Sequence, residues 1–288
     1  MTKRTSMGFG VVALALVVLV WLFRLPSVSS MSLDASEDSI QRGAYLINAG
    51  GCISCHEGQD TEGLSGGMAL VSEFGTFYAP NITPDTDTGI GGWEGKDFLL
   101  ALQHGRGPQG QFYYPAFPYR AYAGMTDQDV LDIGAYLLSA DPVSNQVPPH
   151  DTPVWLQRWM LAGWNVMADF AGEAAPVLSD DPKVQRGAYL ARNLGHCGEC
   201  HTPRNGLGVP MLDQEFAGAT LGESHADAID AEGLLNWSED DLAFFLFLGM
   251  KADGEYIGGE MESVIEHNTA MLTEEDRQAL AAFFKRSR

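Results

Sequence analysis

Residues 52–56 read Cys-Ile-Ser-Cys-His, and residues 197–201 read Cys-Gly-Glu-Cys-His. This C-x-x-C-H pattern is typical of covalent c-type haem attachment. Two thiols three positions apart can each add to one vinyl group of the same porphyrin. The histidine that follows is then held beneath the ring, where it can bind the iron. Together the two motifs use all four cysteines of the chain, which leaves none for disulfides.

Two other kinds of site also use C-x-x-C pairs, namely zinc ribbons and thioredoxin-like redox pairs. A zinc ribbon gathers four cysteines around one metal, usually with a short separation between the pairs. Here Cys55 and Cys197 are far apart, and each pair is followed at once by its own histidine. The sequence therefore predicts haem attachment at Cys52, Cys55, Cys197 and Cys200, and iron ligation by His56 and His201.

The composition excludes one class of partner. The chain has 288 residues, a hydrophobic content of 45% and a formal net charge of −21. With only 17 Lys plus Arg it cannot form the basic face that nucleic acids require. The acidic charge also disfavours binding to anionic lipid through the protein surface. It can steer a basic partner from a distance, or serve only solubility or adaptation to salt.

The first 30 residues form a targeting segment. Lys3 and Arg4 precede an apolar run from Gly8 to Phe23. As a helix this run is about 24 Å long, which is short of a bilayer core of about 30 Å. Ser27-Val28-Ser29 can serve as a signal-peptidase site. We expect an uncleaved single-pass anchor in preference to a cleaved signal peptide. In both cases the rest of the chain lies on the periplasmic side, where c-type haem is attached.

The second half of the chain repeats the plan of the first. Residues 185–190 read Gln-Arg-Gly-Ala-Tyr-Leu, as do residues 41–46. A tryptophan follows the motif histidine by 37 residues in the first copy and by 36 in the second. A Thr-x-x-Asp capping box follows it by 70 and by 72 residues. We therefore predict a mainly α-helical protein with two tandem haem domains. The expected segments are the targeting segment 1–30, the first haem domain 31–141, a connector 142–180 and the second haem domain 181–288.

Local signals place the expected helices and loops. Residues 58–92 are rich in Gly, Thr, Asp and Pro and are expected to be loop. The connector carries an apolar stretch, Val154 to Phe170, with three tryptophans. We expect it to be a helix packed between the domains, although its tryptophans could instead touch a membrane or a partner. The other expected helices span Ser36 to Asn48 and Trp93 to His104, extend from the capping boxes at Thr126 (to Ser139) and Thr273, and start at Asp181-Pro182.

The sixth iron ligand should come from the loop before the last helix of each domain, because that loop folds over the other face of the haem. Methionine sulfur raises the reduction potential and suits electron transfer. In the second domain we choose Met261, which follows two glycines, with Met271 as the runner-up. In the first domain Met125 is the only methionine of that loop, and His104 is the alternative. Possible donors to the haem propionates are Trp93, Arg106, Tyr119 and Arg204.

With these residues in place, the chain resembles the membrane-anchored cytochrome c subunits of bacterial periplasmic alcohol, gluconate and sorbitol dehydrogenases. The resemblance runs from about residue 40 to the C-terminus. Many relatives have P-A-M-P-Y in the first domain, and here Phe117 replaces the methionine, so the family pattern also leaves Met125 as the ligand. The resemblance rests on the segments Gly75-Thr76, Asn81-Ile82-Thr83-Pro84-Asp85, Gly89-Ile90-Gly91, Tyr114-Pro115-Ala116, Met125-Thr126-Asp127 and residues 195–205. In the last of these, Gly195-His196 precedes the second motif and Thr202-Pro203-Arg204-Asn205 follows it.

The resemblance implies two cytochrome c-like domains with one covalent haem c each, in the shorter branch of a family whose best-known members carry three. It implies a non-enzymatic subunit that passes electrons from a periplasmic dehydrogenase to quinone, a soluble cytochrome or a terminal oxidase. The alternative is a haem enzyme, such as a dihaem peroxidase, which would act at a haem with an open sixth position. A thiosulfate dehydrogenase typically uses a cysteine ligand, and no spare cysteine exists.

Overall fold

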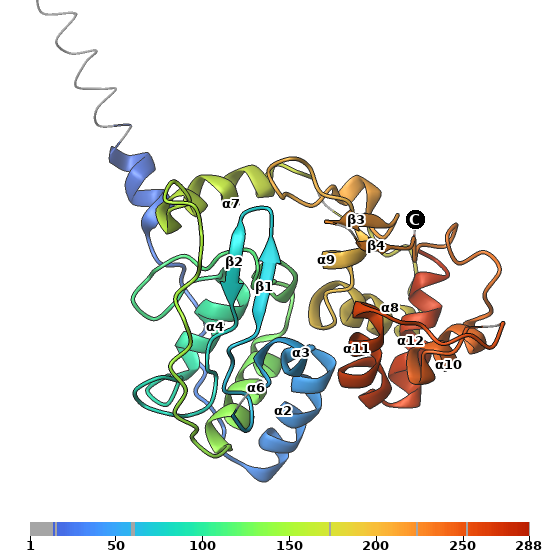
Figure 1. The fold of residues 1–288 in the computed structure, drawn as a ribbon, viewed down its shortest axis with the longest axis horizontal. Helices are drawn as coiled ribbons and strands as arrows, with labels where there is room; N and C mark the ends of the chain where they lie inside the picture. Colours follow the sequence, from blue (N-terminus) through green and yellow to red (C-terminus); the bar gives the residue numbers. More distant parts are fainter. Residues whose placement is uncertain are drawn as a thin grey trace, which may run out of the picture.

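The structure is a computed structural model, and it describes residues 14, 16–58, 61–172, 174–222, 224–251 and 253–287. The described part of the chain is mainly α-helical with two short β-hairpins, which confirms the expectation of a mainly helical protein. In Figure 1 the residues of the first repeat lie on the left and those of the second on the right, with α7 above the first repeat and leading toward the second.

The first repeat contains a β-hairpin that the sequence analysis missed. We expected residues 58–92 to be loop, but Ala69–Ser72 and Gly75–Tyr78 form an antiparallel pair. Strands of four residues are too short to show a clear alternation, and Gly75 adopts a φ of 119°, open only to glycine, at the turn. The elements in order are α2 (Glu37–Ala49), α3 (Cys52–His56), β1 (Ala69–Ser72), β2 (Gly75–Tyr78), α4 (Gly95–His104), α5 (Tyr119–Tyr122) and α6 (Asp127–Ser139).

The second repeat follows the same order. A 3-10 turn, η1 (Arg158–Met160), and helix α7 (Leu161–Asp169) connect it to the first. Its two strands pair antiparallel from Ala219–Ala226 to Leu221–Ser224. The elements are α8 (Pro182–Tyr189), the π-turn η2 (Leu190–Leu194), α9 (Gly198–His201), η3 (Leu212–Gln214), β3 (Ala219–Leu221), β4 (Ser224–Ala226), α10 (Glu239–Leu248), α11 (Glu260–His267), η4 (Thr269–Met271) and α12 (Glu274–Phe284).

The helix starts agree with the sequence. An N-cap side chain accepts a hydrogen bond from a backbone N–H in the first turn and so satisfies one of the free donors there. The structure shows this bond at the three predicted caps, Thr126, Asp181 and Thr273. It also shows it at Ser36, the expected first residue of its helix, which is the N-cap of α2. Trp93 lies just outside its helix, because α4 begins at Gly95.

A glycine in the repeated Gln-Arg-Gly-Ala-Tyr-Leu segment sets how the first and last helices of each repeat cross. A Cβ added to Gly43 would lie 2.0 Å from the carbonyl oxygen of Asp132 in α6. A Cβ added to Gly187 would lie 1.9 Å from the carbonyl oxygen of Ala279 in α12. Any larger residue would therefore push α2 away from α6, or α8 away from α12. The repeated segment is a helix-crossing motif.

The two repeats share one hydrophobic core and dock reciprocally. A single buried cluster contains leucines, isoleucines and phenylalanines from both repeats. Tyr45 of the first repeat donates its hydroxyl hydrogen to Asp276 Oδ2 of α12, at an O–O distance of 2.6 Å. Tyr189, the matching residue of the second repeat, bonds to Asp129 of α6. Each tyrosine also accepts the backbone N–H of the N-cap threonine of that opposite helix. The contact is therefore close to two-fold symmetric.

Removing one of these hydroxyls should weaken the contact between the repeats. Tyr45→Phe deletes a donor to a carboxylate and is expected to lower the free energy of unfolding by about 1.5 kcal/mol. Tyr256→Phe is the matched control, because the Tyr256 side chain is 65% exposed, and it should leave stability unchanged. Denaturant unfolding followed by circular dichroism measures both. Equal stability of the two variants would show that the tyrosine bridge contributes nothing.

An ion pair within each repeat makes the stability of the fold depend on pH. Burial alone would raise the pKa of Asp132 and of Asp276, but arginine and hydroxyl partners outweigh it and lower both below 3.8. Arg42 bonds to Asp132 and Arg186 bonds to Asp276, each at 2.7 Å. A lowered folded pKa gives stability that is present above the unfolded value and lost as pH falls through the folded one. The free energy of unfolding of Asp276→Asn should therefore fall less steeply below pH 3.8 than that of the parent protein. Identical acid titration curves would show that the Asp276 ion pair does not cause the loss of stability.

The predicted membrane anchor lies partly outside the described residues. Residues 1–13 and residue 15 are not among them. Residues 16–23 are helical, and Leu16, Val17, Leu19, Val20 and Trp21 expose more than half of their surface. Among the residues that the structure describes, none forms a helix that is both long and apolar enough to cross a bilayer.

Candidate haem sites

Each C-x-x-C-H motif folds as a single helical turn after a residue with positive φ. Gly51 has a φ of 63° before α3, and His196 has a φ of 40° before the motif at α9. This left-handed residue turns the chain sharply out of the preceding helix. One helical turn then holds the two thiols and the histidine of each motif close together. The local geometry fits the attachment of one porphyrin at each motif.

The two motif histidines make the same second contact. His56 Nδ1 lies 2.8 Å from the carbonyl oxygen of Pro80, and His201 Nδ1 lies 2.6 Å from that of Asp227. A carbonyl can only accept, so Nδ1 carries the hydrogen and Nε2 keeps its lone pair for a metal. Burial lowers the pKa of both imidazoles and so favours this neutral form. Each acceptor lies just after the hairpin of its repeat, which gives the hairpins a role.

The thiols do not have the character of a redox pair. Burial raises the pKa of Cys52 to about 12 and that of Cys197 to about 12. A reactive thioredoxin-like cysteine needs a lowered pKa, because the thiolate is the nucleophile. Among the described residues no group of three or more Cys, His, Asp or Glu could hold a metal ion. Neither the zinc-ribbon nor the redox alternative gains support.

The reciprocal docking brings the two motifs next to each other. A Cβ on Gly50 would lie 3.8 Å from the carbonyl oxygen of Leu194, and one on Gly195 would lie 3.8 Å from that of Ala49. Between them His196 Nε2 lies 3.5 Å from the position of a Cβ on Gly51. The sequence pattern gives His196 no evident role of its own, and the residue at the matching position before the first motif is Gly51. In the structure this half-buried imidazole fills the space that Gly51 leaves between the motifs.

Two polar side chains close the same interface. The hydroxyl of Tyr122 donates to the carbonyl oxygen of Gly50 at 2.8 Å, and its ring meets His196 edge-on. From the second repeat, Asn268 Nδ2 donates to the carbonyl oxygen of Ala49 at 3.1 Å. Both carbonyls belong to the end of α2, directly before the first motif. Each repeat thus contributes a side chain that fixes this helix end.

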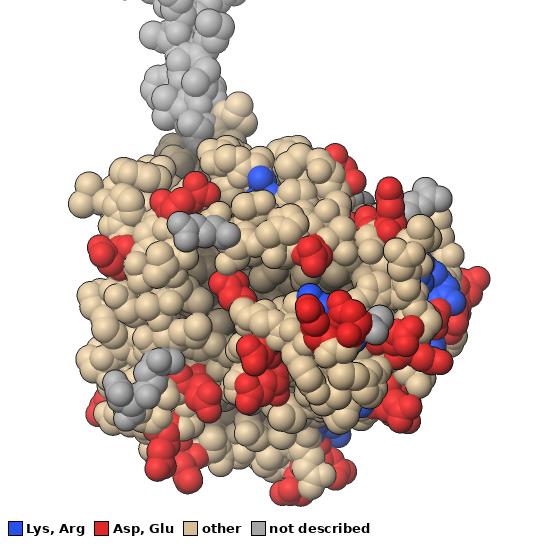
Figure 2. Space-filling model, turned by 45° about the vertical axis from the view of Figure 1, so that its right-hand side comes forward, with Lys and Arg blue, Asp and Glu red and all other residues tan. Residues whose placement is uncertain are grey.

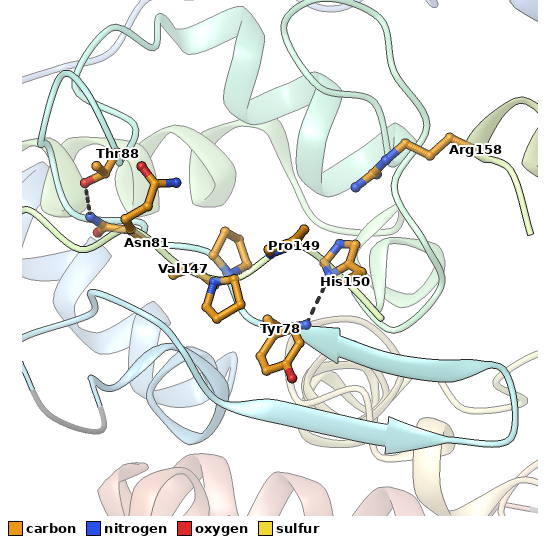
Figure 3. Close-up of a pocket in the computed structure, with 10 residues that line it drawn as sticks. Tyr78, Asn81, Thr88, Val147, Pro149, His150 and Arg158 are labelled. Atoms are coloured by element: carbon orange, nitrogen blue, oxygen red, sulfur yellow. Dashed lines mark hydrogen bonds between the residues drawn. The ribbon is translucent and has the colours of Figure 1, made fainter. Parts of the chain in front are cut away.

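The connector fixes the carbonyl that orients His56. Its backbone pairs with β2 through Thr76 and Asp151, at 2.8 and 2.9 Å, and His150 Nδ1 accepts the backbone N–H of Tyr78 at 3.1 Å. Asn81 Nδ2 donates to the carbonyl oxygen of Val143 at 2.7 Å. Figure 3 shows the cavity of about 340 Å³ that remains between these segments and Arg158. The connector therefore bonds to residues on both sides of Pro80, Tyr78 before it and Asn81 after it, and so fixes the Pro80 carbonyl.

The predicted sixth ligands lie in different settings. Met125 is buried, with 4% of its surface exposed, directly before the N-cap of α6. Met261 is half-buried in the first turn of α11. We expected a loop there, but most of the segment before α12 is helical. The alternative Met271 is 54% exposed, whereas His104 is partly buried at the end of α4.

The four candidate propionate donors differ in their partners. Arg106 is 5% exposed, stacks 3.7 Å above the Phe112 ring and leaves its Nε without a partner. Among the described residues it forms no ion pair, so a buried carboxylate would suit it. Its Nη2 donates to the carbonyl oxygen of Phe23 at 3.2 Å. Of the other three, Trp93 packs on Phe98, Tyr119 donates to Asn165 at 2.7 Å, and Arg204 pairs with Glu199.

Comparison with known proteins agrees with this site. The family profile described as cytochrome c matches residues 40–141. A dihaem c-type cytochrome of Cereibacter sphaeroides is 40% identical over 99% of this chain and 98% of its own length. The chain belongs to the dihaem c-type cytochromes. As a member of that family it carries two covalently bound haem c groups, as the two motifs predicted.

Longer relatives are also similar to this dihaem cytochrome. The cytochrome c subunit of gluconate 2-dehydrogenase from Pantoea cypripedii is 37% identical over 90% of the chain and 62% of the relative. The cytochrome c subunit of a quinone-dependent alcohol dehydrogenase from Gluconobacter oxydans is 35% identical over 88% of the chain and 55% of the relative. The chain thus spans little more than half the length of these subunits. Their names give the peroxidase alternative no support.

Proposed function

We propose that this dihaem cytochrome is a non-enzymatic subunit that carries electrons from a periplasmic dehydrogenase to quinone, a soluble cytochrome or a terminal oxidase. One observation carries the proposal: the docked repeats place the two C-x-x-C-H motifs side by side, with His196 next to Gly51. Covalent attachment at adjacent motifs holds two haems near each other. When bound, each haem supplies a one-electron couple.

In this proposal the residues of the chain bind and orient the two groups. Cys52 and Cys55 hold the first haem, and Cys197 and Cys200 hold the second. His56 and His201 bind iron through Nε2 because the Pro80 and Asp227 carbonyls hold Nδ1. Met125 and Met261 supply the sixth ligands, and the buried Arg106 is the favoured propionate donor. Two haem domains, 31–141 and 181–288, follow an N-terminal anchor.

The acidic surface is relevant to the partner. Figure 2 shows many Asp and Glu side chains and few Lys and Arg on one face of the molecule. The formal charge of −21 would speed the approach of a positively charged surface and would make the encounter sensitive to salt. We propose that the dehydrogenase subunit presents a complementary basic face.

The test uses membranes from a host strain with and without this gene. With a sugar acid, alcohol or sugar as substrate, membranes that lack the protein should lose oxygen uptake while dehydrogenase activity with an artificial dye persists. Loss of both activities in equal measure would indicate that the chain itself catalyses the oxidation. Unchanged oxygen uptake on every dehydrogenase substrate would refute the proposed role.

A further inference from the structure

The inner face of the connector helix carries three hydrogen-bonding side chains that contact the rest of the protein. Trp164 Nε1 donates to the carbonyl oxygen of Leu207 at 2.9 Å, and Asn165 Oδ1 accepts from Tyr119. Just before the helix, Arg158 donates to the carbonyl oxygen of Phe112 at 2.8 Å. Leu161, Ala162 and Ala168 are buried on the same side. Asp169, which is exposed beside this face, pairs with Arg120 at 2.9 Å.

The outer face is apolar and uncovered. Trp159, Met167 and Phe170 are 63%, 46% and 85% exposed, and their spacing places them on one side of the turn and helix from 158 to 170. Gly163 lies on the same stripe, and a Cβ there would meet nothing within 4 Å. Trp155, just before the helix, is 57% exposed. A contiguous apolar stripe on an otherwise acidic protein indicates a contact surface.

The root of the N-terminal helix is fixed to the inner face of the same connector. Leu22 packs against a small cluster that contains Leu161 and Ala162 of α7. Phe23 meets the Phe112 ring edge-on, and its carbonyl oxygen accepts a hydrogen bond from Arg106 at 3.2 Å. In Figure 1 this helix leaves the body beside α7, at the same edge of the molecule. A membrane that received the N-terminal helix would therefore lie against α7.

We propose that the outer face of η1 and α7, defined by Trp155, Trp159, Gly163, Met167 and Phe170, lies on the lipid surface as a second membrane contact. This rests on the proposed anchoring by the N-terminal segment. Tryptophan is enriched at membrane–water interfaces, and an apolar helix face can embed at the headgroup boundary. The face carries no acidic side chain within this stripe, so the overall acidity does not oppose contact with a zwitterionic lipid.

The contact would fix the orientation of the haem units above the membrane. An anchor of one helix alone allows the body to tilt and rotate. A second contact some residues away along the connector removes that freedom, because the connector is bonded to both repeats. The surfaces of the first and second repeats would then keep constant heights above the bilayer.

The experiment places a nitroxide spin label at Gly163→Cys in the full-length holoprotein, reconstituted into phosphatidylcholine nanodiscs. The haem attachments use all native cysteines, so the new thiol is the one that reacts. Power saturation compares access of oxygen, which concentrates in lipid, with access of a water-soluble nickel chelate. The matched control is Glu37→Cys, an exposed position at the start of α2, which begins at the opposite edge of the molecule in Figure 1.

The expected result is that oxygen relaxes the label at 163 more than the nickel chelate does, with the reverse order at 37. Nickel access that exceeds oxygen access at 163, while the protein stays in the disc, would overturn the second contact and leave the anchor standing. A label at 163 that neither reagent reaches would indicate that protein covers the face and would also overturn it. Failure to enter the disc would overturn both the anchor and the contact.

Discussion

Cys197→Ala is expected to reduce the haem content of the purified protein from two equivalents per chain to one. Loss of Cys197 breaks the pair of thiols that the attachment requires, and the second site then keeps only the Cys200 thiol, His201 and packing to retain its haem. The first motif keeps its two thiols, its histidine and the carbonyl of Pro80 at 2.8 Å. Pyridine haemochrome analysis against protein concentration measures the ratio directly.

The matching variant at the first motif, Cys52→Ala, is the control. It should also contain one haem per chain, bound at the second motif. The close docking adds a further expectation, because Gly50 and Gly195 lie against the other repeat. Each variant should also lower the unfolding temperature of the repeat that keeps its haem. Two equivalents of haem in either variant would contradict the assignment of the attachment residues.

Met261→Ala is expected to lower the reduction potential of one haem by roughly 100 mV or more, within the roughly 0.8 V range over which axial ligands tune haems. Thioether sulfur raises the potential, so its loss leaves the oxidised iron relatively more stable. The haem content should stay at two, because attachment does not involve this residue. Potentiometric titration followed at the haem absorbance band resolves the two waves.

The matched control for this prediction is Met271→Ala. Met271 is also a methionine before α12, but it is 54% exposed on the turn η4. Its removal should leave both potentials unchanged. A shift in Met271→Ala together with none in Met261→Ala would exchange the two roles and would place the ligand closer to the start of α12.

Features written in short, local sequence patterns were predictable. The caps at Thr126, Asp181 and Thr273 needed one side chain each, and the helices begin directly after them. The mainly helical fold and the repeated plan followed from the Gln-Arg-Gly-Ala-Tyr-Leu copies. The haem attachment motifs follow from covalent chemistry that demands a fixed spacing.

Features that depend on distant backbone were not predictable. The carbonyls of Pro80 and Asp227 have no side-chain signal, since every residue carries a carbonyl. Their similar distances after the motif histidines, 24 and 26 residues, could have suggested a shared role. The reciprocal bonds of Tyr45 and Tyr189 depend on how the repeats dock, which the repeat pattern does not specify.

The composition of the connector does not predict which of its side chains are buried. We favoured a helix packed between domains for Val154 to Phe170, and Trp164 does pack inward. Trp155 and Trp159 instead face outward, at 57% and 63% exposure. A stretch that is apolar on every side predicts burial on every side, and only the structure distinguishes the covered face from the uncovered one.

The most direct test of the relay measures how an electron moves between the two haems of one chain. In the Met261→Ala holoprotein the reduction potentials of the two haems should be well separated. A limiting amount of a flash-generated reductant first reduces either haem. The electron then moves to the haem of higher potential. We expect a first-order redistribution whose rate does not change with protein concentration. A redistribution rate that rises in proportion to protein concentration would contradict it, because electrons would then pass between molecules and not through the pair of haems within one.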